Sequence, residues 1–278
     1  MIRKIFVVMI VGLLVISSQI ASAEDYDWSQ AKRVGTKAEL ARYIENERRN
    51  GNTTIRVILT NELKTSTEKF YNEFGDKAAK NFINIALVPH VDVDGTHFTD
   101  GTVQMTCQIT EYPGTRVANA YLSRNREQAW MDLTNEEQKL YNIAVGIVDE
   151  ANKRNSEVEK ARYIHDEICR HVLSYKDENE RNKTAIGALI DNYAQCQGFT
   201  DAFYMLGRMC GLNVCRINGT LQGEPHAWNF ITFSDGKSYC IDVTNGFNTK
   251  TTYLFCATKE RMEKVGWWCE WSIIPNLQ

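Results

Sequence analysis

Residues 194–212 read AQCQGFTDAFYMLGRMCGL, and this stretch decides how the rest of the chain is interpreted. Its apolar side chains recur at helical spacing, and Gly211 is typical of the position just past a helix end. The sequence therefore predicts a helix that begins near Cys196. A thiol at a helix start lies beside unpaired backbone N–H groups and the positive end of the helix dipole, which lower its pKa and can hold an oxyanion. Taken alone, a cysteine in this position is more often a buried structural residue.

Two later segments add an imidazole and a carboxylate. Residues 224–231 (EPHAWNFI) carry His226, and residues 237–245 (KSYCIDVTN) carry Asp242. We expect strands over 226–233 and 239–243. A thiol at a helix start, an imidazole on one strand and a carboxylate on the next are the parts of a Cys-His-Asp nucleophilic apparatus, in which the imidazole takes the thiol proton and the carboxylate fixes its tautomer.

The turn between these strands decides whether His226 and Asp242 can face each other. Because side chains alternate along a strand, a two-residue loop at Asp235-Gly236 would put them on opposite faces. A three-residue loop over 234–236 instead pairs His226 with Thr244. Asp242 then lies diagonally opposite His226, and both side chains point to the same face of the sheet. Such a loop needs a residue in the left-handed conformation, and Gly236 supplies it. We predict a type I turn with a bulge at Gly236.

The three segments, in this order and with these separations, resemble the core of the transglutaminase-like superfamily in its bacterial secreted branch. The resemblance runs from about residue 161 to residue 245. It implies a papain-like α+β core in which the helix bearing the nucleophile packs on an antiparallel sheet. The N-terminal hundred residues lie outside the resemblance, and their pattern of elements predicts a smaller α+β domain. It also implies that Cys196 is the nucleophile, His226 the base and Asp242 the orienting carboxylate.

The chain departs from the family pattern at Ile186, where many relatives carry an aromatic residue, so a side-chain oxyanion donor is not assigned. Candidates for lining the oxyanion or the substrate are Gln197, Tyr175 and Trp228, the last resembling the aromatic that often follows this histidine. Near the C-terminus, Trp267, Trp268 and Trp271 either close a core edge or line a peptide groove.

No cofactor or metal is expected. The acidic residues near Asp92 lack the ligand order of a calcium loop, and a turn between strands is the preferred interpretation. The eight cysteines show no C-x-x-C spacing, which argues against a zinc knuckle. If Cys196 is free, the remaining number is odd, so at least one other thiol is free as well; the pairing of the others stays open.

The first 23 residues have the features of a cleaved signal peptide. Arg3 and Lys4 precede an apolar run over 5–16, and Ala21-Ser22-Ala23 is a small-residue cleavage site. The run is shorter than the roughly 20 residues of a membrane helix. We therefore expect a secreted protein, extracellular or associated with the cell surface, without a transmembrane anchor after cleavage. Its expected parts are a signal peptide (1–23), an N-terminal α+β domain of unknown role (24–125) and a transglutaminase-like catalytic domain (126–278).

The other elements are expected from periodicity and turn residues. In the N-terminal part we expect a helix over 36–49, a strand over 55–59, a helical segment over 66–86, and a meander around 103–109 with turns at Asp94-Gly95, Asp100-Gly101 and Pro113-Gly114. Two capping boxes, Thr134 with Glu137 and Ser156 with Glu159, predict a pair of antiparallel helices. A short helix over 184–192, a strand over 214–217 and a loop through Gly219, Gly223 and Pro225 follow.

Composition limits the class of protein. Of 278 residues, 43% are hydrophobic and only 4 are Pro, so the chain can bury a core. A net charge of −3 leaves no basic excess for a phosphate backbone, so nucleic acid is not an expected partner. The residues favour a cysteine acyl-transfer enzyme acting on peptide or protein amide bonds through an acyl-thioester, with hydrolysis preferred. Transfer to an amine by a crosslinking transglutaminase, and a catalytically silent binding module on the same fold, are the alternatives.

Overall fold

The structure is a computed structural model that describes residues 26–65, 90–176 and 179–278. The chain divides into two compact units, residues 1–31 and 32–278. The predicted signal peptide and the predicted helical segment over 66–86 lie outside the described residues. In the first unit, one turn of 3-10 helix (η1, Trp28–Gln30) is described. All other elements below belong to the second unit.

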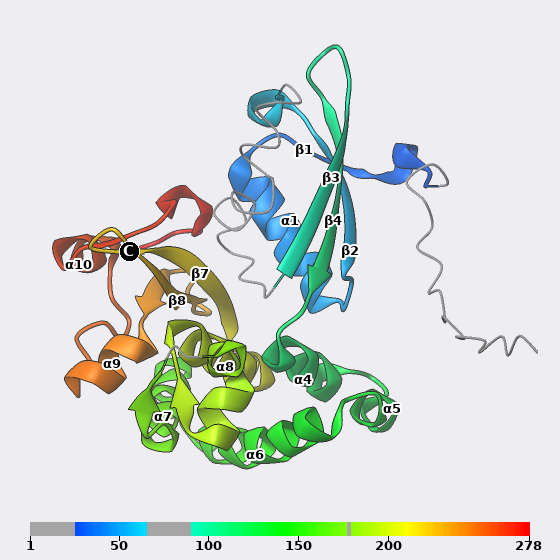
Figure 1. Cartoon of the computed structure of the whole chain (residues 1–278). Helices are drawn as coiled ribbons and strands as arrows, with labels where there is room; N and C mark the ends of the chain where they lie inside the picture. The colour runs from blue at the N-terminus through cyan, green and yellow to red at the C-terminus, as the bar shows by residue number, and fades with distance from the viewer. Residues whose placement is uncertain (1–25, 66–89, 177–178) are drawn as a thin grey trace, which may run out of the picture. The chain divides into compact units, whose positions relative to one another are not determined.

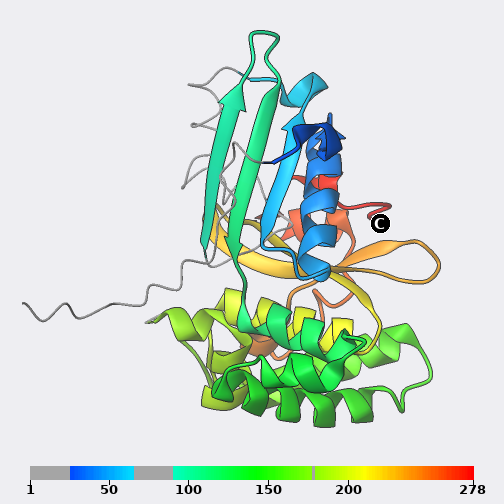
Figure 2. The same ribbon diagram turned by 90° about the vertical axis from the view of Figure 1, so that its right-hand side faces the viewer.

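A four-stranded sheet with one helix against it forms the first part of the second unit (Figures 1 and 2). Its elements are β1 (Lys32–Val34), α1 (Lys37–Arg49), β2 (Thr54–Leu59), η2 (Asn61–Leu63), β3 (His90–His97) and β4 (Val103–Thr110), and the strand order is β1-β2-β4-β3. Every second residue of β4 is buried, and these side chains pack with Leu40 and Ile44 of α1. The alternation predicted around 103–109 is therefore a strand covered on one face by α1.

Two of the predicted turns in this part are wrong. Asp94-Gly95 lies inside β3, where the two residues pair with Thr106 and Met105 of β4. The chain turns after His97, at the second predicted position, Asp100-Gly101. Pro113-Gly114 begins helix α4 (Pro113–Leu122) because proline suits the first helical turn, where no N–H donor is needed.

A layer of helices follows. It consists of α4, α5 (Arg126–Met131), α6 (Asn135–Ala151), α7 (Glu157–His171) and α8 (Cys196–Met209). Thr134 and Glu137 form the predicted capping box of α6. At α7, Ser156 accepts from the Glu159 N–H, but the Glu159 carboxylate accepts from the backbone of Asn155 instead of closing the box. Apolar residues of α4 lie in one core with those of α6, α7 and α8, and the domain boundary near residue 125 stays a prediction.

The segment between α7 and α8 is less regular than predicted. It contains β5 (Ser174–Tyr175), η3 (Glu180–Lys183), η4 (Gly187–Asp191) and β6 (Tyr193–Ala194). The short helix expected over 184–192 is present over 185–191, but its last five residues (η4) form a wider π-helical turn, which ends at Asn192 in the left-handed conformation (φ 65°). The parallel pair β5 and β6 then delivers the chain to α8.

The second sheet holds the candidate site. It contains β7 (Asn213–Leu221), β8 (Glu224–Thr232), β9 (Ser238–Ile241) and β10 (Trp267–Trp268) in the order β10-β7-β8-β9, with all neighbours antiparallel. The predicted loop between 217 and 226 is wrong, since β7 and β8 form a continuous hairpin that turns at Gln222 and Gly223. The chain ends with α9 (Val243–Thr249), α10 (Lys259–Lys264) and η5 (Trp271–Ile273).

The two faces of this sheet are covered differently. Helix α8 packs with Val214, Ile231 and Ile241 on one face, and a second cluster, which contains Trp228 and Trp267, fills the other. The fold is therefore α+β, with the helix that carries Cys196 packed on an antiparallel sheet, as predicted.

Candidate active site

Cys196 is the first residue of α8, and Gln195 before it has an extended backbone (φ −104°, ψ −179°). The side chain is partly exposed and packs against Tyr112 and Ala227. Because the first N–H groups of a helix have no intrahelical acceptor, those of Cys196 and Gln197 can donate to an anion beside the thiol. The local geometry is that of a nucleophile next to an oxyanion site.

The hairpin that carries His226 has the predicted register. Asn229 pairs with Ile241 and Thr232 with Ser238, which leaves the three-residue loop over 234–236. Gly236 lies in the left-handed region (φ 82°), as the predicted bulge requires. The prediction that fixed the relative faces of the two strands is confirmed.

The position of Asp242 is different from the prediction. Strand β9 ends at Ile241, so His226 does not pair with Thr244, and Asp242 is the N-cap residue of α9. Its Oδ1 accepts from the backbone N–H of Asn245 (3.0 Å), a local bond that competes with extending the strand. The carboxylate still lies beside the imidazole: the distance between His226 Nε2 and Asp242 Oδ2 is 2.8 Å.

The three side chains interact in series. Nε2 of His226 faces Asp242, which leaves Nδ1 for the thiol of Cys196. Burial of the ring acts to lower the pKa of His226, but the Asp242 carboxylate outweighs it. Together with a hydrogen bond and negative charge from Cys196, the carboxylate raises the pKa of His226 to about 10. At neutral pH the ring is then an imidazolium ion beside the side chain of Cys196.

Two tryptophans hold the imidazole ring. Trp228 stacks on it with ring centroids 5.9 Å apart, and Trp267 meets it edge to face at 5.8 Å. Trp267 Nε1 also donates to Asp242 Oδ2 at 2.8 Å. Sequence reasoning had Trp267 only as a core or groove aromatic. No local signal identifies its role, because the contact depends on β10 returning to the sheet 25 residues after Asp242.

The three residues predicted to line the oxyanion or the substrate lie in different surroundings. Gln197 follows the nucleophile, and no partner for its buried Oε1 lies in the described part of the chain. Trp228 is 1% exposed and lies behind the imidazole. Tyr175 is 41% exposed on β5, whose partner β6 runs directly into Gln195 and Cys196. Their lining roles stay predictions.

All eight cysteines are free thiols in the structure. Burial raises the pKa of most of them; that of Cys210, at the other end of α8, rises to about 11. Among residues 26–65, 90–176 and 179–278, no group of three or more His, Cys, Asp or Glu side chains could hold a metal ion. The same residues contain no helix long and apolar enough to span a membrane.

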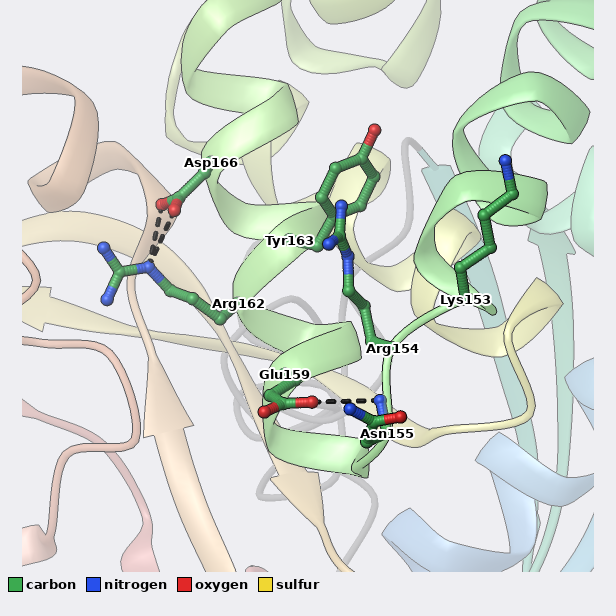
Figure 3. Close-up of a pocket in the computed structure, with 7 residues that line it drawn as sticks. All are labelled: Lys153, Arg154, Asn155, Glu159, Arg162, Tyr163 and Asp166. Atoms are coloured by element: carbon green, nitrogen blue, oxygen red, sulfur yellow. Dashed lines mark hydrogen bonds and ion pairs between the residues drawn. The ribbon is translucent and has the colours of Figure 1, made fainter.

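A surface pocket lies elsewhere, at the turn between α6 and α7 (Figure 3). Its polar groups largely satisfy one another: Arg162 pairs with Asp166, Glu159 accepts from the backbone of Asn155, and the Arg154 guanidinium lies 4.5 Å from the centre of the Tyr163 ring. None of the three candidate catalytic side chains lines this pocket.

Comparison with solved structures finds likenesses at low identity. A crystal structure of a TGase is 16% identical over 69% of this chain and 51% of its own, with a TM-score of 0.36. A protein proposed to be a cysteine protease from Cytophaga hutchinsonii is 15% identical over 56% of this chain and 62% of its own (TM-score 0.31). The periplasmic domain of TgpA from Pseudomonas aeruginosa is 10% identical over 58% and 64% (TM-score 0.32). The chain thus spans between half and two thirds of the length of these structures.

No curated protein matches the chain. The family model of the transglutaminase-like superfamily matches residues 142–243, which include α7, α8, the β7-β8-β9 sheet, and all three residues of the Cys-His-Asp series. Over this segment the chain is similar to the transglutaminase-like superfamily.

Proposed function

We propose that this protein is a cysteine acyl-transfer enzyme that acts on amide bonds of peptides or proteins, with water as the preferred acceptor. The observation that carries the proposal is the 2.8 Å bond between the His226 imidazole and the Asp242 carboxylate, in a series in which the Cys196 side chain acts on the same imidazole. A binding module would need no such series.

The proposed reaction has two halves. The thiolate of Cys196 attacks the amide carbonyl carbon, and the oxyanion accepts hydrogen bonds from the backbone N–H groups of Cys196 and Gln197. The C–N bond breaks as the His226 imidazolium gives its proton to the leaving amine, which yields an acyl-thioester. His226 then takes a proton from water, or from an incoming amine, as that group attacks the thioester and releases the Cys196 thiolate, which restores the starting pair.

Asp242 keeps the imidazole in the tautomer that can receive a proton at Nδ1, because it accepts the hydrogen on Nε2. Export to the outside of the cell or to its surface is part of the proposal and is supported by the sequence of residues 1–23.

The first experiment measures the reactivity of Cys196. Iodoacetamide labelling between pH 5 and 9, followed peptide by peptide with mass spectrometry, should show labelling of Cys196 at low pH and much faster than that of Cys210. Cys210 is the matched thiol, because it ends the same helix and its pKa is raised to about 11. Labelling of Cys196 at the rate and pH of an ordinary exposed thiol would contradict the proposal.

The second experiment identifies the acyl acceptor. A peptide library is incubated with and without a primary amine, and the product masses separate hydrolysis from amide transfer. Cys196→Ala should abolish turnover without loss of fold, whereas Cys210→Ala should keep it. Amine adducts as the main product would favour a crosslinking transglutaminase, and turnover by Cys196→Ala would end the enzyme proposal.

A further inference from the structure

Trp267 contacts both members of the imidazole–carboxylate pair. Its Nε1 lies 2.8 Å from Asp242 Oδ2, the oxygen that also faces His226 Nε2 at 2.8 Å. Its ring meets the His226 ring edge to face. Because Asp242 Oδ1 accepts from Asn245, each carboxylate oxygen has a donor even without the imidazole.

This contact depends on an unusually close approach between two strands. Trp268 and Trp267 of β10 pair with Thr220 and Leu221 of β7, next to Gly219, which pairs with His226. A Cβ atom at Gly219 would lie 2.1 Å from the Trp268 carbonyl oxygen and 2.4 Å from the Trp228 ring. Only glycine fits there, so the sequence at 219 is matched to the position of β10.

The aromatic residues around this place are not equivalent. Trp267 is buried with its N–H on the carboxylate, whereas Trp271, in the same cluster, has a buried Nε1 for which no partner lies in the described residues. Trp268, the neighbour of Trp267, is 57% exposed. General aromatic packing therefore does not account for the orientation of Trp267.

From this geometry we infer that Trp267 is a positioning residue: its indole N–H shares the carboxylate oxygen with His226 and limits how strongly Asp242 holds the imidazolium proton. A donor to a carboxylate stabilises the negative charge and weakens its attraction for a second donor. An imidazolium whose Nε2 hydrogen is held less tightly is a stronger acid, so it gives its Nδ1 proton more readily to a leaving amine. This role deepens the proposed function and rests on it.

Other ionisable groups face Asp242 from the surrounding elements, and the variant below leaves all of them in place. They are His226 of β8, which is part of the series itself, His165 and Cys169 of α7, and Cys240 of β9. Burial lowers the pKa of His165, and burial raises those of Cys169 and Cys240, so at neutral pH these three groups are uncharged.

The test is the pKa of His226, measured by NMR titration of its ring, in the full chain and in Trp267→Phe. His226→Gln identifies the resonance. Removing the indole N–H should raise the pKa of His226 by about half a unit or more, because the N-cap bond to Asn245 keeps the carboxylate in place. Trp271→Phe removes an indole from the same cluster and should leave the pKa unchanged. An unchanged pKa in Trp267→Phe, or an equal shift in both variants, would overturn the inference.

A measurement on the unsubstituted protein covers the case in which Trp267→Phe fails to fold. The chemical shift of the Trp267 indole N–H should change as His226 titrates, and that of Trp271 should not. A Trp267 shift that stays constant through this titration would also overturn the inference. Labelling of Cys196 by iodoacetamide reports separately on the proposed function. A shifted His226 pKa with an unreactive Cys196 would refute the enzyme and leave the hydrogen-bond assignment intact.

Discussion

Replacing Arg216 with methionine should destabilise the protein by about 3–5 kcal/mol, because it leaves a buried carboxylate without its cation. Arg216 of β7 and Asp201 of α8 are both 0% exposed and form an ion pair. The guanidinium also donates to Thr115 and lies 3.6 Å from the centre of the Tyr204 ring. In Arg216→Met these contacts vanish, and Asp201 keeps only backbone N–H donors, among them that of Ala185.

Urea unfolding followed by tryptophan fluorescence measures this loss as a shift of the midpoint at constant slope. The double variant Asp201→Asn with Arg216→Met should be less destabilised than Arg216→Met alone, because no unpaired charge stays buried. Lys259→Met is the control: its ion pair with Glu263 is exposed, and exposed pairs contribute well under about 1 kcal/mol. The reasoning would be refuted if Arg216→Met lowered the free energy of unfolding by less than about 1 kcal/mol. It would also be refuted if the double variant lost more stability than the two single variants together.

The other predictions concern the triad, one cap and one turn. Folding raises the pKa of His226 from 6.5 to about 10. Protonation of His226 therefore stabilises the fold fully below about pH 6.5, and this contribution is lost as pH rises toward 10. In urea unfolding, the wild type should lose more stability between pH 7 and 10 than His226→Gln. Asp242→Asn should lower turnover of the cleaved peptide about a hundredfold or more, with its circular dichroism unchanged. Thr134→Ala removes the N-cap acceptor of α6 and should cost about 1 kcal/mol in the same unfolding assay. Gly236→Ala, at φ 82°, should cost roughly 1 kcal/mol, and a smaller loss would argue against the bulge.

Elements with a strong local signal could be predicted from the sequence. The hairpin between β8 and β9 is the clearest case, because one Gly in the left-handed conformation fixes the loop length, and the loop length fixes the register. The start of α8 at Cys196 and the cap of α6 at Thr134 likewise depend on a few neighbouring residues. Residues within one or two turns along the sequence determine these positions.

The secondary structure of Asp242 could not be predicted from its neighbours in the sequence. Its apolar neighbours continue the alternation of β9, yet its carboxylate can bond to the N–H three residues later and start a helix. Both outcomes put the side chain near His226, so the candidate catalytic residue was identified although its secondary structure was not. Pro113 is a similar case, in which a residue common in turns begins α4.

The residues that contact the candidate catalytic side chains and their helix could not be predicted, because they come from distant parts of the chain. Trp267 reaches Asp242 only through the return of β10, and Asp201 accepts a hydrogen bond from the backbone of Gly114 at 3.2 Å. Tyr204 of α8 donates to Glu45 of α1 at 2.9 Å. Neither Glu45 nor Gly114 lies within residues 142–243 that match the family model.

These contacts give the residues before α5 a physical connection to the nucleophile. Asp201 and Tyr204 lie on the helix that begins with Cys196, and their buried partners are residues of α1, of the start of α4, and of β7. Buried polar groups are costly unless satisfied, so displacing α1 would leave the Tyr204 hydroxyl without Glu45, and displacing α4 would remove the Gly114 N–H from Asp201. Helix α1 and the start of α4 therefore help to stabilise the helix that begins with Cys196.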